Sequence, residues 1–296
     1  MGESQEPIAA ITGGAGRVGR LVAADLLDRG FRVRILDLPQ VSFEGLAGTA
    51  GVQILAGDIG DGAYLEAAFV GASAIAHLAA VLPPAADDRP DLARRVNVEG
   101  TRNVLSAMRR AAPRARLVFS SSVVVYGNTQ GEQPPVAADR SLQGRGGYAE
   151  SKIAAEALVW ESGVRAVTLR ISGVSVADFL MPPVPWPFTA EQRMEFVLLE
   201  DVASAVAAAV CAGERVNGTA FNISGGPTWR MRGRDYSDAY YGAFEIPPEE
   251  ARFLKESRAF DFYETAPAAE ELGFEPVPFA EFQTMLKEAI ALALSG

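Results

Sequence analysis

A glycine-rich turn, set between a short apolar run and a helical pattern, is the feature that most constrains the fold of this chain. The apolar run covers residues 7–12 and has the size of a buried parallel strand. The turn Gly13-Gly14-Ala15-Gly16-Arg17-Val18-Gly19 follows, and apolar residues then recur at helical spacing until Gly30. Strand, tight turn and helix form the first part of a βαβ unit. In such a unit the glycines let the backbone approach a diphosphate at the amino end of the helix.

An acidic residue follows the next predicted strand. This strand covers residues 31–36 and ends at Asp37, about 20 residues past the turn. A carboxylate in this place accepts hydrogen bonds from ribose hydroxyls and repels a 2′-phosphate. We therefore expect NAD as the cofactor, with NADP less favoured. Arg17 and Arg34 lie nearby in the sequence and could weaken that preference.

Strands and helices keep alternating up to about residue 170. Strands are predicted over residues 52–56, 74–78, 116–120 and 165–170, and helices over 63–70, 92–111 and 148–161. Shorter elements follow: a strand over 194–199, a helix over 201–212, a strand over 220–223, and helices over 266–272 and 278–294. This order predicts an α/β protein with a Rossmann-type doubly wound parallel sheet. We expect a dinucleotide-binding domain over residues 1–170 and a small C-terminal substrate-binding lobe over 171–296, with elements that return to the sheet.

Composition and charge argue against several classes of partner. The chain has 37 acidic and 27 basic residues and no concentrated basic run, so we expect it to bind neither nucleic acid nor an anionic membrane. Its single cysteine, Cys211, excludes an intrachain disulfide, and we expect no metal site. No apolar stretch approaches the roughly 20 residues that span a bilayer, and residues 1–6 lack a signal-peptide pattern. These features predict a cytoplasmic protein.

Tyr148 and Lys152 are four residues apart in a predicted helix. A phenol and an ammonium at this spacing project from one face about 6 Å apart. The cation favours the phenolate and is expected to lower the tyrosine pKa from its ordinary value of about 10. Such a tyrosine can exchange protons with an alcohol or a ketone. A Tyr-x-x-x-Lys pair also arises by chance, so its meaning depends on the glycine-rich turn in the same chain.

With these motifs in order, the chain resembles the extended short-chain dehydrogenase/reductase superfamily, in its NAD-dependent epimerase/dehydratase branch, along most of its length. Five segments carry the resemblance before Tyr148 and Lys152: Thr12 to Gly19, Gly57-Asp58-Ile59, His77-Leu78-Ala79-Ala80, Asn97-Val98-Glu99-Gly100-Thr101, and Ser120-Ser121-Ser122 through Tyr126-Gly127.

The resemblance implies a role for each matching residue. Tyr148 is the general acid/base, Lys152 binds the nicotinamide ribose and lowers the tyrosine pKa, and Ser122 hydrogen-bonds the reacting oxygen. Asn97 has a supporting, positional role, and His77 is structural. The implied cofactor site consists of Gly13, Gly16, Arg17, Val18, Gly19, Asp37, Asp58, Ile59, Leu78, Ala79, Ala80, Asn97, Ser120, Tyr148, Lys152 and Ile171. The expected substrate contacts are Val81, Ser122, Val123, Tyr148, Gly173, Met181 and Trp186.

Departures from the family pattern narrow the reaction. Val123 and Val124 occupy the places of the Asp-Glu pair of the dehydratases, and valines cannot transfer protons. Gly173 stands where the sugar-nucleotide epimerases have an asparagine that contacts the substrate diphosphate. We therefore expect an NAD-dependent oxidoreductase that interconverts a secondary alcohol and a ketone on a small non-nucleotide substrate. A sugar or sugar-nucleotide epimerase that retains NAD is the alternative. A non-catalytic dinucleotide sensor is less favoured, because it would not need Tyr148, Lys152 and Ser122.

Three further patterns remain open. The segment 181–188, with Met181, Val184, Trp186 and Phe188, either lines the substrate pocket or is a stiff packing connector. Arginines at 193, 230, 232 and 234 suit an anionic substrate, although such residues more often lie at the surface. The helices over 92–111 and 148–161 resemble those that pair in a four-helix interface in the superfamily. The resemblance thus implies a homodimer, although Leu158, Val159 and Trp160 fit an intramolecular core equally well.

Overall fold

The computed structural model describes residues 6–257 and 259–295. The chain forms two compact units. Unit 1 contains the residues up to Ser122, Arg145–Leu169 and Ala203–Phe221, and unit 2 contains Val123–Gly144, Arg170–Val202 and the residues from Asn222 onward. The boundary predicted at residue 170 is one of the points where the chain passes between the units. Residues 123–144 lie in unit 2, before that boundary, and residues 203–221 lie in unit 1, after it; the latter contain most of β10 Thr219–Ile223, which joins the central sheet.

Seven strands form the central sheet, in the order β10-β6-β5-β4-β1-β2-β3. The strands are β1 Ile8–Thr12, β2 Arg32–Asp37, β3 Val52–Ala56, β4 Ala74–His77, β5 Arg116–Ser122, β6 Ala166–Ile171 and β10 Thr219–Ile223. Strand β1 pairs in parallel with both β2 and β4, and Thr12 lies beside Leu36 on one side and His77 on the other. The connections run in opposite directions from β1, and ligands bind at such a switch point beyond the carboxyl ends of the strands. The predicted doubly wound α/β fold is confirmed.

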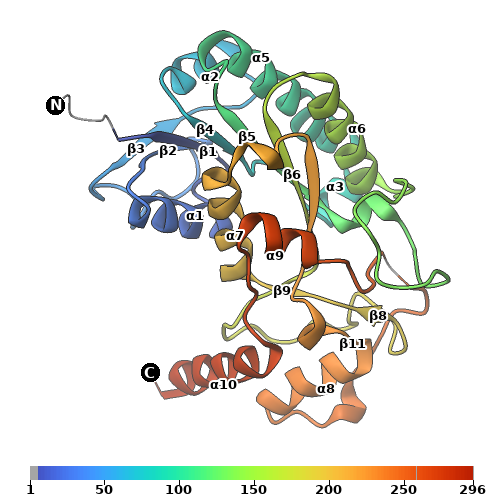
Figure 1. Cartoon of the computed structure of the whole chain (residues 1–296). Coiled ribbons are helices and arrows are strands. Elements are labelled where there is room, and N and C mark those ends of the chain that lie inside the picture. Colours follow the sequence, from blue (N-terminus) through green and yellow to red (C-terminus); the bar gives the residue numbers. More distant parts are fainter. Residues whose placement is uncertain (1–5, 258, 296) are drawn as a thin grey trace. The chain divides into compact units, whose positions relative to one another are not determined.

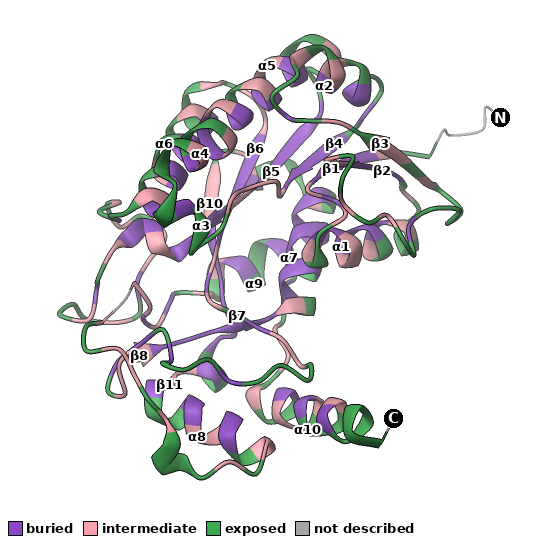
Figure 2. Cartoon of the chain, turned by 180° about the vertical axis from the view of Figure 1, so that it is seen from behind, coloured by how far each residue is buried: buried purple, intermediate pink, exposed green. Residues whose placement is uncertain are grey.

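Helices cover both faces of the sheet in unit 1 (Figure 1). The helices α2 Gly62–Phe69, α5 Thr101–Ala111 and α6 Gly147–Glu161 lie on one face, and α1 Arg17–Asp28 lies on the other. Large apolar side chains, among them Phe69, Met108 and Phe119, fill the space beneath the first group. The central strands β1, β4 and β5 are accordingly almost entirely buried (Figure 2).

The helix predicted over residues 92–111 is interrupted. It consists of α4 Pro90–Ala93, the π-helical segment η1 Arg94–Gly100, and α5. Gly100 meets the β3–α2 connection closely, since a Cβ added there would lie 2.5 Å from Ile59 Cδ1. Wide turns of this kind are frequent at functional sites, and η1 carries Asn97.

Unit 2 contains short strands and further helices. Its longer helices are α8 Gly233–Ala243, α9 Ala266–Leu272 and α10 Phe279–Ser295. Strand β8 Arg193–Met194 pairs with β11 Met231–Arg232, and β7 Val174–Ser175 pairs with β9 Val197–Leu198. The single strand predicted over 194–199 is thus two strands in different sheets. Helix α7 Leu199–Cys211 leads from unit 2 into unit 1, and the remaining short helices are α3 Ala85–Asp88, η2 Val123–Tyr126, η3 Glu214–Val216, η4 Pro227–Trp229 and η5 Pro248–Glu250.

Candidate active site

The glycine-rich turn is lined by backbone, as the sequence predicts. Gly13 has a φ of 70°, and a Cβ added to it would lie 2.8 Å from Ala79 N. At Gly19 an added Cβ would lie 2.6 Å from Gly13 O, so the first turn of α1 packs directly on the loop. Only glycine fits these two positions without a shift of the backbone. The turn at the end of β1, here called the cradle, is thus packed directly on neighbouring backbone at these two glycines.

The amino end of α1 opens onto this cradle. Its N-cap residue is Gly16, which has no side chain to cap the helix. The first N–H groups of a helix have no partner within it and carry the positive end of the helix dipole. A diphosphate is the group that such an end accommodates. The turn and the helix therefore fit the dinucleotide that the sequence predicts.

Asp37 lies beside the same turn. Its Oδ2 accepts a hydrogen bond from Ala15 N at 3.0 Å and its Oδ1 accepts one from Leu38 N at 2.9 Å. A carboxylate has about four acceptor positions, so acceptor capacity remains for the ribose hydroxyls. These contacts hold the half-buried carboxylate in place at the carboxyl end of β2.

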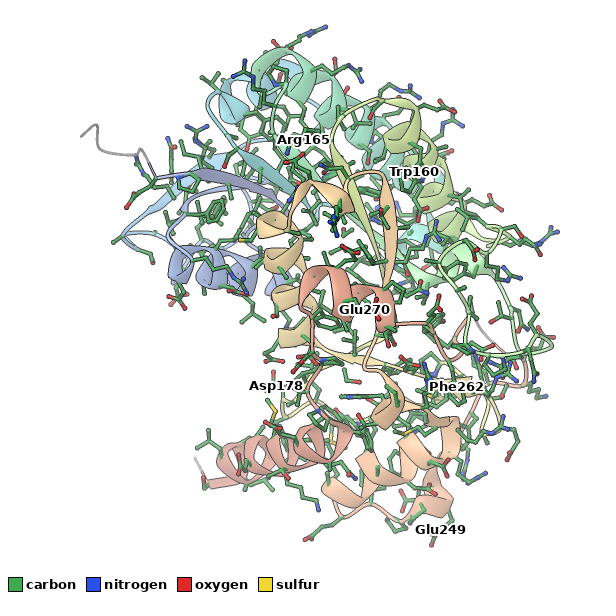
Figure 3. All side chains as sticks on the ribbon, in the orientation of Figure 1. Trp160, Arg165, Asp178, Glu249, Phe262 and Glu270 are labelled. Carbon is green, nitrogen blue, oxygen red and sulfur yellow. The ribbon has the colours of Figure 1, made fainter. Side chains whose placement is uncertain are left out.

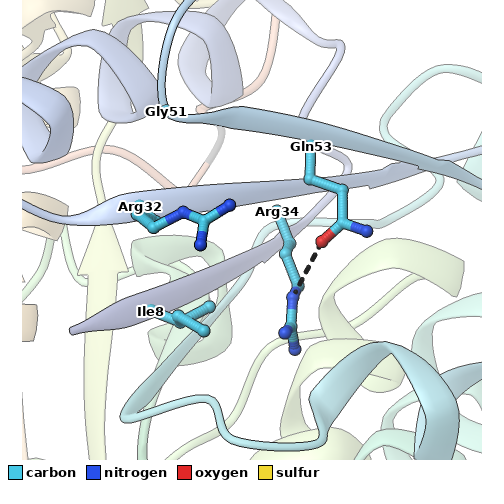
Figure 4. Close-up of a pocket in the computed structure, with 5 residues that line it drawn as sticks. All are labelled: Ile8, Arg32, Arg34, Gly51 and Gln53. Carbon is cyan, nitrogen blue, oxygen red and sulfur yellow. Dashed lines mark hydrogen bonds between the residues drawn. The ribbon is translucent and has the colours of Figure 1, made fainter. Parts of the chain in front are cut away.

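The hydrogen bonds of Arg34 go to residues other than Asp37. Its guanidinium donates to Ala68 O and Val70 O at the end of α2, at 2.9 and 2.6 Å, and to Gln53 Oε1 at 3.2 Å. Arg34 and Gln53 also line a cavity of about 40 Å³, together with Ile8, Arg32 and Gly51 (Figure 4). The cavity lies toward the amino ends of β1 and β2, opposite the edge of Thr12 and Asp37.

Further predicted cofactor residues of unit 1 follow the carboxyl ends of β3 and β4. Asp58 is exposed and accepts a hydrogen bond from Gly60 N at 2.7 Å. Ile59 is buried against Gly100. Leu78, Ala79 and Ala80 are half-buried, and Leu78 N donates to Thr12 O at 3.1 Å. The structure thus brings these residues to the edge that carries the glycine turn.

Ser122, Tyr148 and Lys152 lie together between β5 and α6. Ser122 is the last residue of β5, and its hydroxyl hydrogen-bonds the Tyr148 side chain. Lys152 Nζ donates to Ser120 O at 2.8 Å and lies 5.9 Å from the centroid of the Tyr148 ring. Lys152 is buried and Tyr148 is half-buried. A proton donor, a hydroxyl and a cation therefore share one site within unit 1.

The pKa values in this site differ from the sequence-based expectation. Burial raises the pKa of Tyr148 to about 12, the hydrogen bond from Ser122 lowers it, and the charge of Asp87 raises it. Lys152 Nζ donates to the Ser120 carbonyl, and its effect on the pKa of Tyr148 stays a prediction. Burial also lowers the pKa of Lys152 to about 8, against the opposing charge of Glu156.

Asn97 connects the loop after β4 with α6. Its Oδ1 accepts from Val81 N at 2.7 Å, and its Nδ2 donates to Val81 O at 3.0 Å and to Ser151 Oγ at 3.0 Å. Ser151 directly precedes Lys152. These contacts connect two elements of the site, and the supporting role of Asn97 stays a prediction.

Five predicted site residues belong to unit 2: Val123, Ile171, Gly173, Met181 and Trp186. Trp186 is only 4% exposed and packs against Phe188, Tyr236, Tyr240 and Tyr241, which favours the packing-connector interpretation for this residue. Met181, in contrast, is 66% exposed. An added Cβ at Gly173 would lie 2.3 Å from the Phe196 ring, so the local packing requires glycine there. The substrate contacts of this unit stay predictions.

The arginines considered for an anionic substrate have partners inside unit 2. Arg193 pairs with the buried Asp261 at 2.7 Å, and Arg230 pairs with the buried Glu195 at 2.9 Å. Arg232 donates to Glu191 O at 2.8 Å, and the Arg234 guanidinium lies over the Phe253 ring. These contacts give each arginine a structural role.

Sequence reasoning missed two acidic residues of the active site. Glu156 is fully buried and accepts a hydrogen bond from Ser121 Oγ at 2.5 Å. It follows Lys152 by four residues, so helical spacing could have indicated it. Asp87 accepts a hydrogen bond from Tyr148 N at 3.0 Å across 61 positions of sequence, and no local pattern reveals that contact.

Two negative findings apply to residues 6–257 and 259–295 alone. No group of three or more histidine, cysteine, aspartate or glutamate side chains there could hold a metal ion. No helix in the same part of the chain is long and apolar enough to cross a membrane.

Comparison with known proteins agrees with this fold. The sequence model of the NAD dependent epimerase/dehydratase family matches residues 9–179, more than half of the chain. The protein therefore belongs to the NAD dependent epimerase/dehydratase family, as its motifs predict.

Individual relatives within the family differ in activity. The chain is 35% identical over 183 residues to a D-erythronate dehydrogenase from Cupriavidus necator, which covers 56% of this chain and 55% of that protein. It is 34% identical over 154 residues to a UDP-glucose 4-epimerase from Streptomyces lividans, with coverage of 50% and 45%. The chain thus matches about half the length of these relatives.

A solved structure covers almost the whole chain. A short-chain dehydrogenase/reductase superfamily protein from Agrobacterium tumefaciens, determined with bound NAD, superposes with a TM-score of 0.78 and 24% identity, and covers 97% of both chains. At this identity the match establishes the shared fold.

Proposed function

We propose that the protein is an NAD-dependent oxidoreductase that interconverts a secondary alcohol and a ketone on a small non-nucleotide substrate. The observation that carries the proposal is the cluster of Tyr148, Ser122 and Lys152 in unit 1, on the sheet whose β1–α1 turn fits a dinucleotide. A phenol hydrogen-bonded to a hydroxyl beside an ammonium is an arrangement that can transfer a proton to or from a substrate oxygen.

NAD is the proposed cofactor. When bound, it supplies the hydride acceptor or donor for the reaction. The cradle of Gly13, Gly16 and Gly19 would hold its diphosphate and Asp37 its ribose hydroxyls. The further contacts are those predicted from the sequence. The family to which the chain belongs and the NAD bound to the Agrobacterium protein support this choice.

In the reducing direction, Tyr148 donates its phenolic proton to the oxygen of the substrate ketone while Ser122 hydrogen-bonds the same oxygen. A phenol with a pKa of about 12 is protonated at neutral pH, so it is ready to donate. Alcohol oxidation needs the phenolate instead, and the nearby Lys152 ammonium stabilises that charge as it forms. The buried Glu156 helps to keep the ammonium protonated.

The substrate class is tested by turnover of a chemically diverse panel. The panel contains small hydroxy acids such as D-erythronate, a 3β-hydroxysteroid and UDP-glucose, each incubated with NAD, and absorbance is followed in the NADH band. We expect NADH to accumulate with the hydroxy acids, because this chain is 35% identical over 183 residues to a D-erythronate dehydrogenase. Absence of NADH with every alcohol, and of NADH consumption with the matching ketones, would reject the oxidoreductase.

An epimerase that retains NAD is the second candidate, favoured by the match to a UDP-glucose 4-epimerase. An epimerase must keep its cofactor through both half-reactions, whereas a dehydrogenase exchanges it. NAD that stays stoichiometrically bound during gel filtration would favour the epimerase. Cofactor that exchanges freely and turns over favours the dehydrogenase.

We further propose a cytoplasmic homodimer. Trp160 on α6 is 41% exposed, and its side chain is marked in Figure 3. A large exposed aromatic residue on a long helix suits an interface between two copies. Sedimentation of the parent as a dimer and of Trp160→Glu as a monomer would support the assignment, and a monomeric parent would reject it.

A further inference from the structure

The helix that carries Tyr148 begins against a segment that is distant in the sequence. An added Cβ at Gly147, the first residue of α6, would lie 2.3 Å from Ala86 O. Gly146 has a φ of 98°, and its added Cβ would lie 3.2 Å from Asp87 Oδ1. The α3 segment therefore meets the start of α6 with no room for a side chain between them.

Asp87 provides the hydrogen-bond acceptor at this contact. Its Oδ1 accepts from Tyr148 N at 3.0 Å. The N-cap residue of α6 is Gly146, which has no side chain to cap the helix. In many helices the N-cap side chain accepts from one of the first N–H groups. Here a residue from another element makes that contact, with the N–H of the proposed acid/base itself.

We propose that Asp87 is a positioning residue for Tyr148, and that its carboxylate fixes the first turn of α6 so that the phenol stays against Ser122. The catalytic consequence rests on the proposed oxidoreductase function, while the hydrogen bond does not. Small displacements of an acid/base can lower a rate strongly, because proton transfer requires close approach.

The charged groups around the phenol determine what a change at Asp87 does. Ser122 on β5 hydrogen-bonds the phenol, and Lys152 on α6 lies 5.9 Å from its ring. The charge of Asp87 raises the pKa of Tyr148, but the carboxylate is exposed, so water and salt screen it. The hydrogen bond is therefore its main contribution. The charged residues of α4 and η1, which also pack against α6, are Asp91, Arg94, Arg95 and Glu99.

Amide hydrogen exchange tests the contact without any substrate. Tyrosine labelled with ¹⁵N gives amide signals for the seven tyrosines, and Tyr148→Phe identifies the one from Tyr148. In Asp87→Ala we expect the Tyr148 amide to exchange about five to ten times faster, since a capping acceptor is lost. Asp87→Asn keeps an acceptor oxygen and should stay close to the parent, as should the neighbouring control Asp88→Ala. Equal exchange in Asp87→Ala and Asp88→Ala would overturn the proposal.

Kinetics test the consequence for catalysis. We expect kcat of Asp87→Ala to fall about tenfold to 100-fold with a smaller change in KM, and Asp87→Asn to recover most of the loss. Faster amide exchange with unchanged kcat would overturn the positioning role. If Asp87→Ala does not fold, the parent is measured instead at a series of pH values. The NMR chemical shift of its Tyr148 amide must then change as Asp87 becomes protonated, and Asp87→Asn must abolish that change. A parent without turnover would reject the oxidoreductase, and the exchange measurement would still test the contact.

Discussion

His77 illustrates how neighbouring hydroxyls fix the charge of a buried residue. Thr101 Oγ1 donates to Asn97 O and therefore accepts from His77 Nε2, at 3.0 Å. With the proton on Nε2, the neutral ring accepts at Nδ1, and Thr12 Oγ1 donates to it at 2.7 Å. Both ring nitrogens are thus used by the neutral imidazole. Burial, followed by the charge of Lys152, lowers the pKa of His77 to about 3.

This pKa predicts a loss of stability in acid. The unfolded chain binds a proton at His77 near pH 6.5, whereas the folded protein does so near pH 3, so the free energy of unfolding falls between these values as the pH is lowered. The loss from this one group approaches about 1.4 kcal/mol per pH unit. Urea unfolding at pH 7 and pH 5 should give a smaller difference for His77→Gln than for the parent. An equal difference in both proteins would contradict the assignment.

Asp37 is expected to determine the choice of cofactor. Asp37→Ala removes the charge that repels a 2′-phosphate and the acceptor for the ribose hydroxyls. The ratio of kcat/KM for NADP to that for NAD should therefore rise by about tenfold or more. Asp28→Ala provides a matched control, because its exposed carboxylate lies at the last residue of α1, the end opposite to the glycine-rich turn. A ratio unchanged in Asp37→Ala would remove Asp37 from the ribose site.

The first turn of α1 packs directly on the glycine-rich loop after β1. Gly19→Ala places a Cβ 2.6 Å from Gly13 O and from Gly14 Cα, so helix and loop must separate. We expect weaker NADH binding, measured by fluorescence titration, and a lower melting temperature. Gly62→Ala in α2 is the control, since an added Cβ there meets nothing within 4 Å. Unchanged binding in Gly19→Ala would contradict the assignment of the cradle.

The elements that the sequence predicts well are those with strong local patterns. The β1, β2 and β3 strands lie within one residue of their expected bounds, because each is a short β-rich run between turn residues. The helix over 92–111 was expected to be continuous, because its periodicity does not reveal the π-helical segment Arg94–Gly100. Helix α8 was missed because it begins at a glycine and is rich in aromatic residues, which have low helix propensity.

At the scale of the whole molecule, the sequence predicts the fold class well, but it predicts the course of the chain between the two units less well. Local patterns predict the doubly wound sheet, but the passage of residues 123–144 and 203–221 between units depends on long-range packing. The same limit applies to the candidate site. Spacing indicated Tyr148 and Lys152, whereas Asp87 approaches Tyr148 only in three dimensions. Composition could not distinguish the buried Trp186 from the exposed Met181.

Cofactor binding should stabilise the folded protein as a whole. A ligand that binds only the folded state at 100 times its Kd adds about 2.7 kcal/mol to the free energy of unfolding. We therefore expect NAD to raise the melting temperature in a concentration-dependent way and NADP to raise it less, owing to Asp37. No shift at millimolar NAD, in a protein that binds no NADH by fluorescence, would argue against a dinucleotide site.

The most direct test of the account is the turnover rate of Tyr148→Phe with the alcohol or ketone that the parent uses best, measured at saturating cofactor. The variant lacks only the phenolic oxygen, so NADH binding should persist while kcat falls by about 100-fold to 10,000-fold. A variant that turns over substrate as fast as the parent would show that Tyr148 does not transfer the proton.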